Sequence, residues 1–203
     1  MKRLTFKQKR NKLLEYINKY SLYEGKEYRL SSGQYSNFYV DIRRAMLFPQ
    51  ARKLLGEILV NMTWKDPYYH YVGGMSYGAL PISTAYSDAS YRMRNCVIPN
   101  FVVHKEIKNY GLKENITNVF GKLYDDDLED DTFIEVLIVE DIMVTGRSLE
   151  KAINICRNRG YGVYNAIVIL SRVKEIQQIA LKNSVKIKTL FTLEDLDLKC
   201  SLK

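Results

Sequence analysis

The chain lacks any long hydrophobic run and contains little cysteine, proline, tryptophan or histidine. Its 203 residues include 3 Cys, 4 Pro, 1 Trp and 2 His. No stretch is long and apolar enough to cross a bilayer, and the basic N-terminus lacks the apolar core of a secretory signal. Cys96, Cys156 and Cys200 are far apart, odd in number and without metal-site spacing. We therefore expect no disulfide framework, no membrane partner and a reducing, cytoplasmic compartment.

Negative charge is also under-represented. There are 31 Lys and Arg against 23 Asp and Glu, for a formal net charge of +8. Such an excess attracts polyanions, either nucleic acid or a small phosphorylated molecule. Because aromatic-basic RNA-binding repeats are absent, we disfavour a nucleic-acid partner. The hydrophobic fraction of 46% and the charged fraction of 27% are typical of a globular protein, and we expect one domain over 1–203.

The rest of the sequence is organised around the segment 136–148. Four aliphatic residues, Val136–Val139, predict a strand buried on both faces of a parallel sheet. Glu140 and Asp141 follow at its carboxyl end, which is the edge where α/β sheets bind ligands. A short loop, Val144–Ser148, then leads into a segment with helical spacing of apolar residues.

The chemistry of this segment indicates a phosphorylated sugar. A loop at a helix N-terminus offers free N–H groups to a phosphate, and Thr145, Gly146 and Ser148 suit that contact. Glu140 and Asp141 would repel a phosphate, but they can accept hydrogen bonds from sugar hydroxyls or orient a hydrated Mg²⁺. The spacing and lysine of a nucleotide P-loop are absent. The structural alternative is a buried strand that ends in solvated acids.

Strand and helix patterns alternate along the rest of the chain. This predicts an α/β fold with a central, mostly parallel sheet flanked by helices. The hairpin pattern within residues 1–45 predicts a small N-terminal cover over one end of the core. Apolar stripes predict helices over 12–20, 49–62, 81–93, 149–159 and 173–182. Strands are predicted over 97–103, 136–139, 164–170 and 185–189, a strand and glycine-rich turn over 71–81, a hairpin over 28–43, and a capped turn over 192–196.

Residues 136–148 resemble the phosphoribosyl diphosphate (PRPP) signature of the type I phosphoribosyltransferases, in which four apolar residues and two acids precede a Thr-Gly loop. Val144 and Arg147 depart from the usual residues of that loop. The glycine-rich turn resembles the family's diphosphate loop, although one branch has a lysine at the position of Gly78. A strained or cis peptide near Met75-Ser76 would fit that role.

Two further segments are similar to orotate phosphoribosyltransferases in particular. The pattern Leu-x-Ser-Gly-x-x-Ser-x-x-Tyr-x-Asp-x-Arg is matched by Leu30, Ser32, Gly33, Ser36, Tyr39, Asp41 and Arg43. Ser31 stands where that family usually has a lysine. The segment 104–111 resembles the catalytic loop Arg-Lys-Glu-x-Lys-x-His-Gly, with His104 and Tyr110 as departures. This resemblance implies a mobile catalytic hairpin over 104–121 that closes over the neighbouring subunit, and thus a homodimer with shared active sites.

The resemblance also implies the site residues. The implied catalytic residues are Lys108, Glu140 and Asp141. The implied PRPP-binding residues are Ser76, Tyr77, His104, Lys105, Lys108, Tyr110, Glu140, Asp141, Ile142, Met143, Val144, Thr145, Gly146, Arg147 and Ser148. The implied orotate-binding residues are Phe38, Tyr39, Val144 and Arg172, the last through its guanidinium fork. Without the resemblance, Arg172 would be a surface arginine at a strand end.

The resemblance covers residues 10–195 and implies an orotate phosphoribosyltransferase. PRPP and orotate would give orotidine 5′-phosphate and diphosphate in pyrimidine synthesis, with Mg²⁺ held mainly by substrate oxygens and no direct protein ligand. Two alternatives stay open. The departures at Ser31, Val144 and Ser171 favour a transferase for another nucleobase. The net charge, His104 and Tyr110 motivate the second alternative, a non-catalytic RNA-binding or regulatory relative.

Overall fold

The computed structural model describes residues 4–29, 33, 35–105, 115–117 and 133–198. The helices are α1 (Phe6–Tyr20), α2 (Ile42–Ala45), α3 (Pro49–Met62), α4 (Ser76–Arg94), α5 (Arg147–Arg157) and α6 (Ile176–Lys182), with a 3₁₀ turn at Leu193–Asp195. The strands are β1 (Leu22–Arg29), β2 (Tyr35–Val40), β3 (Tyr71–Met75), β4 (Asn100–Val103), β5 (Ile116–Thr117), β6 (Glu135–Met143), β7 (Gly162–Ser171) and β8 (Lys186–Thr192).

Six of the strands form one sheet in the order β5-β4-β3-β6-β7-β8. All neighbours are parallel except β5, which pairs antiparallel with the edge strand β4. From β3 the chain moves outward to β4, whereas from β6 it moves outward in the other direction to β7 and β8. The boundary between β3 and β6 is thus a topological switch point, where α/β sheets bind their ligands. The predicted mostly parallel α/β fold is confirmed.

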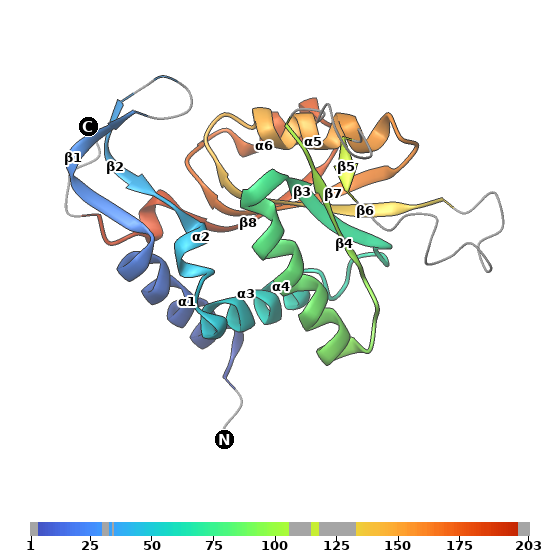
Figure 1. Ribbon diagram of the computed structural model, residues 1–203, viewed down its shortest axis with the longest axis horizontal. Coiled ribbons are helices and arrows are strands. Elements are labelled where there is room, and N and C mark those ends of the chain that lie inside the picture. Colours follow the sequence, from blue (N-terminus) through green and yellow to red (C-terminus); the bar gives the residue numbers. More distant parts are fainter. Residues whose placement is uncertain (1–3, 30–32, 34, 106–114, 118–132, 199–203) are drawn as a thin grey trace.

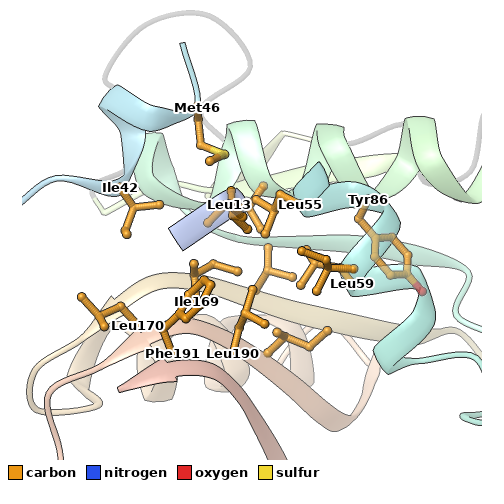
Figure 2. Packing of buried hydrophobic residues seen from close by; sticks show 14 of the residues in the cluster. Leu13, Ile42, Met46, Leu55, Leu59, Tyr86, Ile169, Leu170, Leu190 and Phe191 are labelled. Atoms are coloured by element: carbon orange, nitrogen blue, oxygen red, sulfur yellow. The ribbon is translucent and has the colours of Figure 1, made fainter. Parts of the chain in front are cut away.

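Helices cover both faces of this sheet, with α5 and α6 on one face and α1, α3 and α4 on the other (Figure 1). Alternate residues of β6 enter the two cores. Leu137 and Val139 pack with the α1, α3 and α4 side, and Val136 and Ile138 pack with α5. Figure 2 shows the first of these cores, where side chains from the helices meet those of β7 and β8. The prediction that this strand is buried on both faces is confirmed.

The N-terminal hairpin forms a separate two-stranded sheet. β1 and β2 pair antiparallel, with Leu22 opposite Val40. The sequence placed this hairpin at 28–43, which is wrong at both ends. The first strand begins at Leu22, and Arg43 lies in α2 because the chain turns into a helix directly after Asp41. The hairpin and α2 together lead the chain from α1 to the carboxyl edge of the main sheet.

Several other predicted boundaries are shifted. The helix predicted from residue 12 begins at Phe6, because Thr5 and Gln8 form a reciprocal capping box. The helix predicted from Pro81 begins at Ser76 and includes that proline. The helix predicted from residue 173 begins at Ile176, since the Val173 N–H donates to Ser171 Oγ instead.

Among the described residues, no helix combines the length and the apolar character that a membrane span requires. Some of the predicted features fall outside the described residues. These are Leu30, Ser31 and Ser32 of the N-terminal segment and the catalytic-loop residues Lys108 and Tyr110. Of the predicted hairpin over 104–121, the structure describes His104, Lys105 and residues 115–117, which contain the strand β5 that pairs antiparallel with β4.

Candidate active site

A pocket of about 580 Å³ lies at the carboxyl edge of β3 and β6. It is lined by Arg43, Met75, Ser76, Tyr77, Gly78, His104, Lys105, Glu140, Asp141 and Ser148. Seven of these ten residues are predicted site residues from three separate segments of the sequence. They meet because β3, β4 and β6 are parallel neighbours whose carboxyl ends share one edge.

The two acids of the pocket differ in exposure. Glu140 is 7% exposed, while Asp141 is half-buried and its Oδ1 accepts a hydrogen bond from the Ile142 N–H at 2.8 Å. Burial and the neighbouring Asp141 charge raise the pKa of Glu140 to about 8, and the Lys105 charge opposes this shift. Near neutral pH the Glu140 carboxyl is therefore protonated in most molecules and can donate as well as accept a hydrogen bond.

The raised pKa of Glu140 predicts a pH-dependent stability. Between its ordinary value of 4.5 and about 8 the folded state holds a proton that the unfolded state releases, so stability falls as pH rises through this window. Glu140→Gln removes the ionisable carboxyl and therefore the loss of stability caused by ionising it in the folded state. We expect the variant to gain stability over the parent protein at pH 8.5 and to match it at pH 4.5 in urea titrations. An equal difference at both pH values would contradict this prediction.

Asp141 lies against the first turn of α4. A Cβ atom on Gly78 would lie 2.6 Å from Asp141 Oδ2, so only glycine fits beside this carboxylate in its present position. Burial raises the pKa of Asp141, while the Ile142 N–H and the Arg43 charge oppose the shift. Two largely buried acids that share a pocket favour a ligand that brings hydrogen-bond donors, such as a polyhydroxylated sugar.

The turn from β3 into α4 is strained. Ser76 has a φ of +44°, a value that L-residues rarely adopt, and its hydroxyl donates to the Val103 carbonyl at 3.2 Å. This agrees with the strained alternative predicted for Met75-Ser76, since no peptide bond in the described ranges is cis. This conformation of Ser76 lets α4 begin directly at the pocket, where the N–H groups of its first turn can donate hydrogen bonds to an anion. Tyr77 follows on the rim and is 80% exposed.

The N-terminus of α5 reaches the same pocket from β6. Gly146 has a φ of +77° at the N-cap position, which explains why glycine stands there. Ser148 lines the pocket, whereas Thr145 and Arg147 are exposed beside it. The strand continues four residues beyond the predicted Val139, because Met143 is still paired with β7. Its side chain is 1% exposed in the core under α5 and cannot reach a ligand.

The other residues of the predicted loop are placed differently. Val144 is half-buried between β6 and α5, and it is absent from the lining of the pocket. Ile142 packs against the core on the side of α1, α3 and α4. Any contribution of Ile142 and Met143 to phosphate binding would therefore come from their main chain.

The predicted orotate-binding residues divide into two groups. The Arg172 guanidinium lies over the Phe38 ring, 4.5 Å from its centroid, and Nη2 donates to Ser36 Oγ at 3.2 Å. Burial lowers the pKa of Arg172. Tyr39 points to the opposite face of β2, as alternation along a strand requires, and stacks on Tyr28 at 5.7 Å. The structure thus brings Phe38 and Arg172 together and separates Tyr39 from them.

Two residues of the predicted catalytic loop are described. His104 follows β4, and its Nε2 lies 2.7 Å from the Thr117 hydroxyl of β5. Lys105 is exposed at the pocket, and its main-chain oxygen accepts a hydrogen bond from Lys151 Nζ at 2.6 Å. The Lys105 side chain contributes positive charge next to Glu140. Both residues therefore lie in the pocket because they directly follow the carboxyl end of β4.

Three residues of the pocket were not predicted individually as site residues: Arg43, and Met75 and Gly78, which lie in the glycine-rich turn that resembles the diphosphate loop. Arg43 had a signal, because it is the last residue of the matched pattern in the N-terminal segment. The sequence showed that Gly78 replaces a lysine found in one branch of the family. Nothing in the sequence predicted that Gly78 lies next to Asp141. Met75 forms the end of a buried strand and lines the floor.

The described residues contain no group of three or more His, Cys, Asp or Glu side chains placed to hold a metal ion. The pocket offers the Glu140 and Asp141 carboxylates as oxygen donors. Mg²⁺ commonly binds through one or two carboxylates, several waters and substrate phosphates. The donor set therefore fits Mg²⁺ that arrives with a phosphorylated substrate, and it does not fit a permanent protein cage.

Known proteins resemble this chain over nearly its whole length. It is 32% identical to the orotate phosphoribosyltransferase of Methanocaldococcus jannaschii over 188 residues, 93% of this chain and 97% of that protein. It is 33% identical to the orotate phosphoribosyltransferase of Corynebacterium glutamicum over 189 residues, 93% of this chain and 94% of that protein. No protein-family model matches. The crystal structure of Mycobacterium tuberculosis orotate phosphoribosyltransferase in complex with PRPP has a TM-score of 0.71 at 27% identity and covers 94% of this chain and 99% of that one.

Proposed function

Because this chain belongs to the orotate phosphoribosyltransferase family, the pentosyltransferases of pyrimidine biosynthesis, we propose that the pocket between β3 and β6 is its active site. The substrates are PRPP and orotate. The main support is one juxtaposition. The Glu140 and Asp141 carboxylates lie in one pocket with the N-terminal residues of α4 and α5. Groups that accept hydrogen bonds from sugar hydroxyls therefore lie next to groups that donate hydrogen bonds to phosphate oxygens.

Each part of PRPP then has a partner. The N-terminus of α5 binds the 5-phosphate through main-chain N–H groups and the Ser148 hydroxyl. Glu140 and Asp141 accept hydrogen bonds from the ribose hydroxyls. The first turn of α4 and Lys105 bind the diphosphate, where negative charge grows as it leaves. Lys108 and Tyr110 of the catalytic loop complete this set on the basis of the family resemblance.

The reaction is a displacement at the anomeric carbon. The bond from this carbon to the diphosphate oxygen breaks, a bond to an orotate ring nitrogen forms, and the proton of that nitrogen passes to the departing diphosphate or to water. Positive charge accumulates on the ribose in an oxocarbenium-like transition state. The negative charge of Asp141 stabilises it, and Glu140 holds the hydroxyls that orient the ring. Mg²⁺, held by substrate oxygens and by waters that these carboxylates orient, would neutralise diphosphate charge.

We further propose that the enzyme is a cytoplasmic homodimer in which the loop 104–121 of one subunit covers the site of the other. Its free cysteines, Cys96 and Cys156, suit a reducing compartment. The described part of the loop begins at the pocket, at His104 and Lys105. Sedimentation velocity would test the dimer, and mixing two inactive variants, one in the loop and one in the pocket, would test shared sites by restored activity.

The activity itself is tested by the consumption of orotate. We expect the ultraviolet absorbance of orotate to fall only when PRPP and Mg²⁺ are both present, and Lys108→Ala to lose most of this activity. Binding of PRPP in a calorimeter without orotate turnover would contradict the assignment of the base. Parallel assays with uracil and purines would then identify another nucleobase, and the absence of all turnover would favour a regulatory relative.

Arg172 is expected to bind the orotate carboxylate. Arg172→Lys keeps one charge but loses the planar fork, so we expect the KM for orotate to rise roughly tenfold to a hundredfold, with little change in the KM for PRPP. Steady-state kinetics with each substrate varied in turn would measure this. Lys174→Gln, which removes an exposed charge two residues away, is the matched control and should leave both constants within twofold. Equal changes in both KM values would contradict the role.

A further inference from the structure

The diphosphate side of the pocket is poor in cations for a ligand of this charge. Of the described residues that line it, Arg43 and Lys105 have basic side chains, while Glu140 and Asp141 have acidic ones. Acids next to a diphosphate are unfavourable unless cations offset them. Basic side chains that reach this part of the pocket are therefore important for binding.

The first turn of α4 cannot supply such a side chain. One branch of the family resembled by the sequence has a lysine at the position of Gly78. Here a Cβ atom at that position would lie 2.6 Å from Asp141 Oδ2 and 2.7 Å from its Cγ. A lysine there would have to displace the Asp141 carboxylate. With the Asp141 carboxylate in its present position, a cation for the diphosphate has to come from another element.

Arg43 reaches the pocket from α2. Its Nε donates to Asp41 Oδ1 at 2.7 Å and its Nη2 donates to Asp41 Oδ2 at 2.9 Å. The Asp41 side chain is 12% exposed and the Arg43 side chain 47% exposed, so a well-buried anchor holds an accessible guanidinium. A guanidinium has five N–H donors, and this side-on pairing leaves donors free for a second anion.

We propose that Arg43 is a diphosphate-binding residue of this enzyme, oriented by Asp41, and that it provides from α2 the cation for which Gly78 leaves no room. This inference rests on the proposed function of the pocket. The guanidinium binds the diphosphate both in PRPP and as a product, and it offsets the charge of Asp141 beside it. Arginine suits this role because its planar fork can pair with a carboxylate and a phosphate at once.

The neighbouring residue offers a matched control. Arg44 also approaches Asp41, with its Nε 3.9 Å from Oδ2, and its guanidinium lies over the Tyr23 ring. Its side chain is 59% exposed and it does not line the pocket. Arg43→Gln and Arg44→Gln therefore remove the same charge from the same short helix, and only the first removes it from the pocket.

The test is calorimetric titration of the full-length protein with magnesium diphosphate and with PRPP, in the absence of orotate. We expect Arg43→Gln to weaken diphosphate binding about tenfold to a hundredfold, as the loss of a charge-assisted hydrogen bond does. Arg44→Gln should bind within twofold of the parent protein. Arg43→Lys should recover part of the affinity, and in steady-state assays Arg43→Gln should raise the KM for PRPP and leave the KM for orotate unchanged.

Three outcomes would overturn the proposal. If Arg43→Gln binds diphosphate within twofold of the parent protein, Arg43 pairs with Asp41 but does not bind the diphosphate. Equal losses in Arg43→Gln and Arg44→Gln would indicate a general charge effect. A loss that Arg43→Lys fails to recover, together with a lowered melting temperature in both Arg43 variants, would indicate a structural role. A parent protein that binds PRPP without using orotate would refute the assigned base and leave this test intact.

Discussion

Asp141→Asn is expected to lower kcat/KM for PRPP by about 10²- to 10³-fold, which is the loss typical of removing one preorganised electrostatic group from an active site. Asparagine has nearly the same shape, so the contact with Gly78 is kept. What disappears is the negative charge that we propose stabilises the positive ribose in the transition state. Because kcat should fall more than the affinity for PRPP, the effect separates this role from ground-state binding. Initial rates with PRPP varied at saturating orotate would measure both constants.

The same strand provides the control. Glu135 is a half-buried carboxylate at the other end of β6, where its main-chain N–H donates to His70 Nδ1 at 3.1 Å. Glu135→Gln makes the same chemical change away from the pocket and should leave kcat/KM within twofold. Asp141→Asn should also fold normally, since burial already raises the pKa of Asp141 and the neutral side chain relieves that cost. Full activity in Asp141→Asn would refute the assigned role.

Gly56→Ala is expected to destabilise the fold by about 3 kcal/mol, although alanine favours a helix over glycine by about 1 kcal/mol. Gly56 lies in the middle of α3, where α4 packs closely against it. A Cβ atom there would lie 2.1 Å from the main-chain oxygen of Ala85 and 2.9 Å from the Ala89 Cβ. A main-chain oxygen cannot move away as a flexible side chain can, so the two helices must separate. The cost of overpacking exceeds the gain in helix propensity.

Urea denaturation at pH 7 would measure this change as a lower midpoint with an unchanged slope. For a chain of this size, about 3 kcal/mol corresponds to a melting temperature lower by about 6–12 °C. Gln50→Ala, at an exposed position in the first turn of the same helix, is the control and should stay within about 0.5 kcal/mol. A variant Gly56→Ala that is as stable as the parent would show that α3 and α4 can separate at no cost.

The sequence by itself predicted features that depend on local pattern. Helix α3 begins and ends where the apolar stripe and Pro49 predicted, because a proline suits the first helical turn and the stripe has a single core to face. The run Val136–Val139 predicted a strand buried on both faces, which the two cores confirm. The two acids and the glycine of the loop predicted a ligand site at the carboxyl edge of the sheet, and that edge holds the pocket.

Other features depended on distances between segments remote in the sequence, and only the tertiary structure decided them. The turn of the chain into α2 after Asp41 is what places Arg43 in the pocket with Asp141, about a hundred residues later in the chain. The Asp141 carboxylate occupies the space that a side chain at Gly78 would need, and the main chain of α4 leaves no space for one at Gly56. The pKa of Glu140 rises because the folded chain buries it. Local patterns fix periodicity and caps, whereas clearance, burial and charge pairing arise only when strands and helices from different parts of the chain pack together.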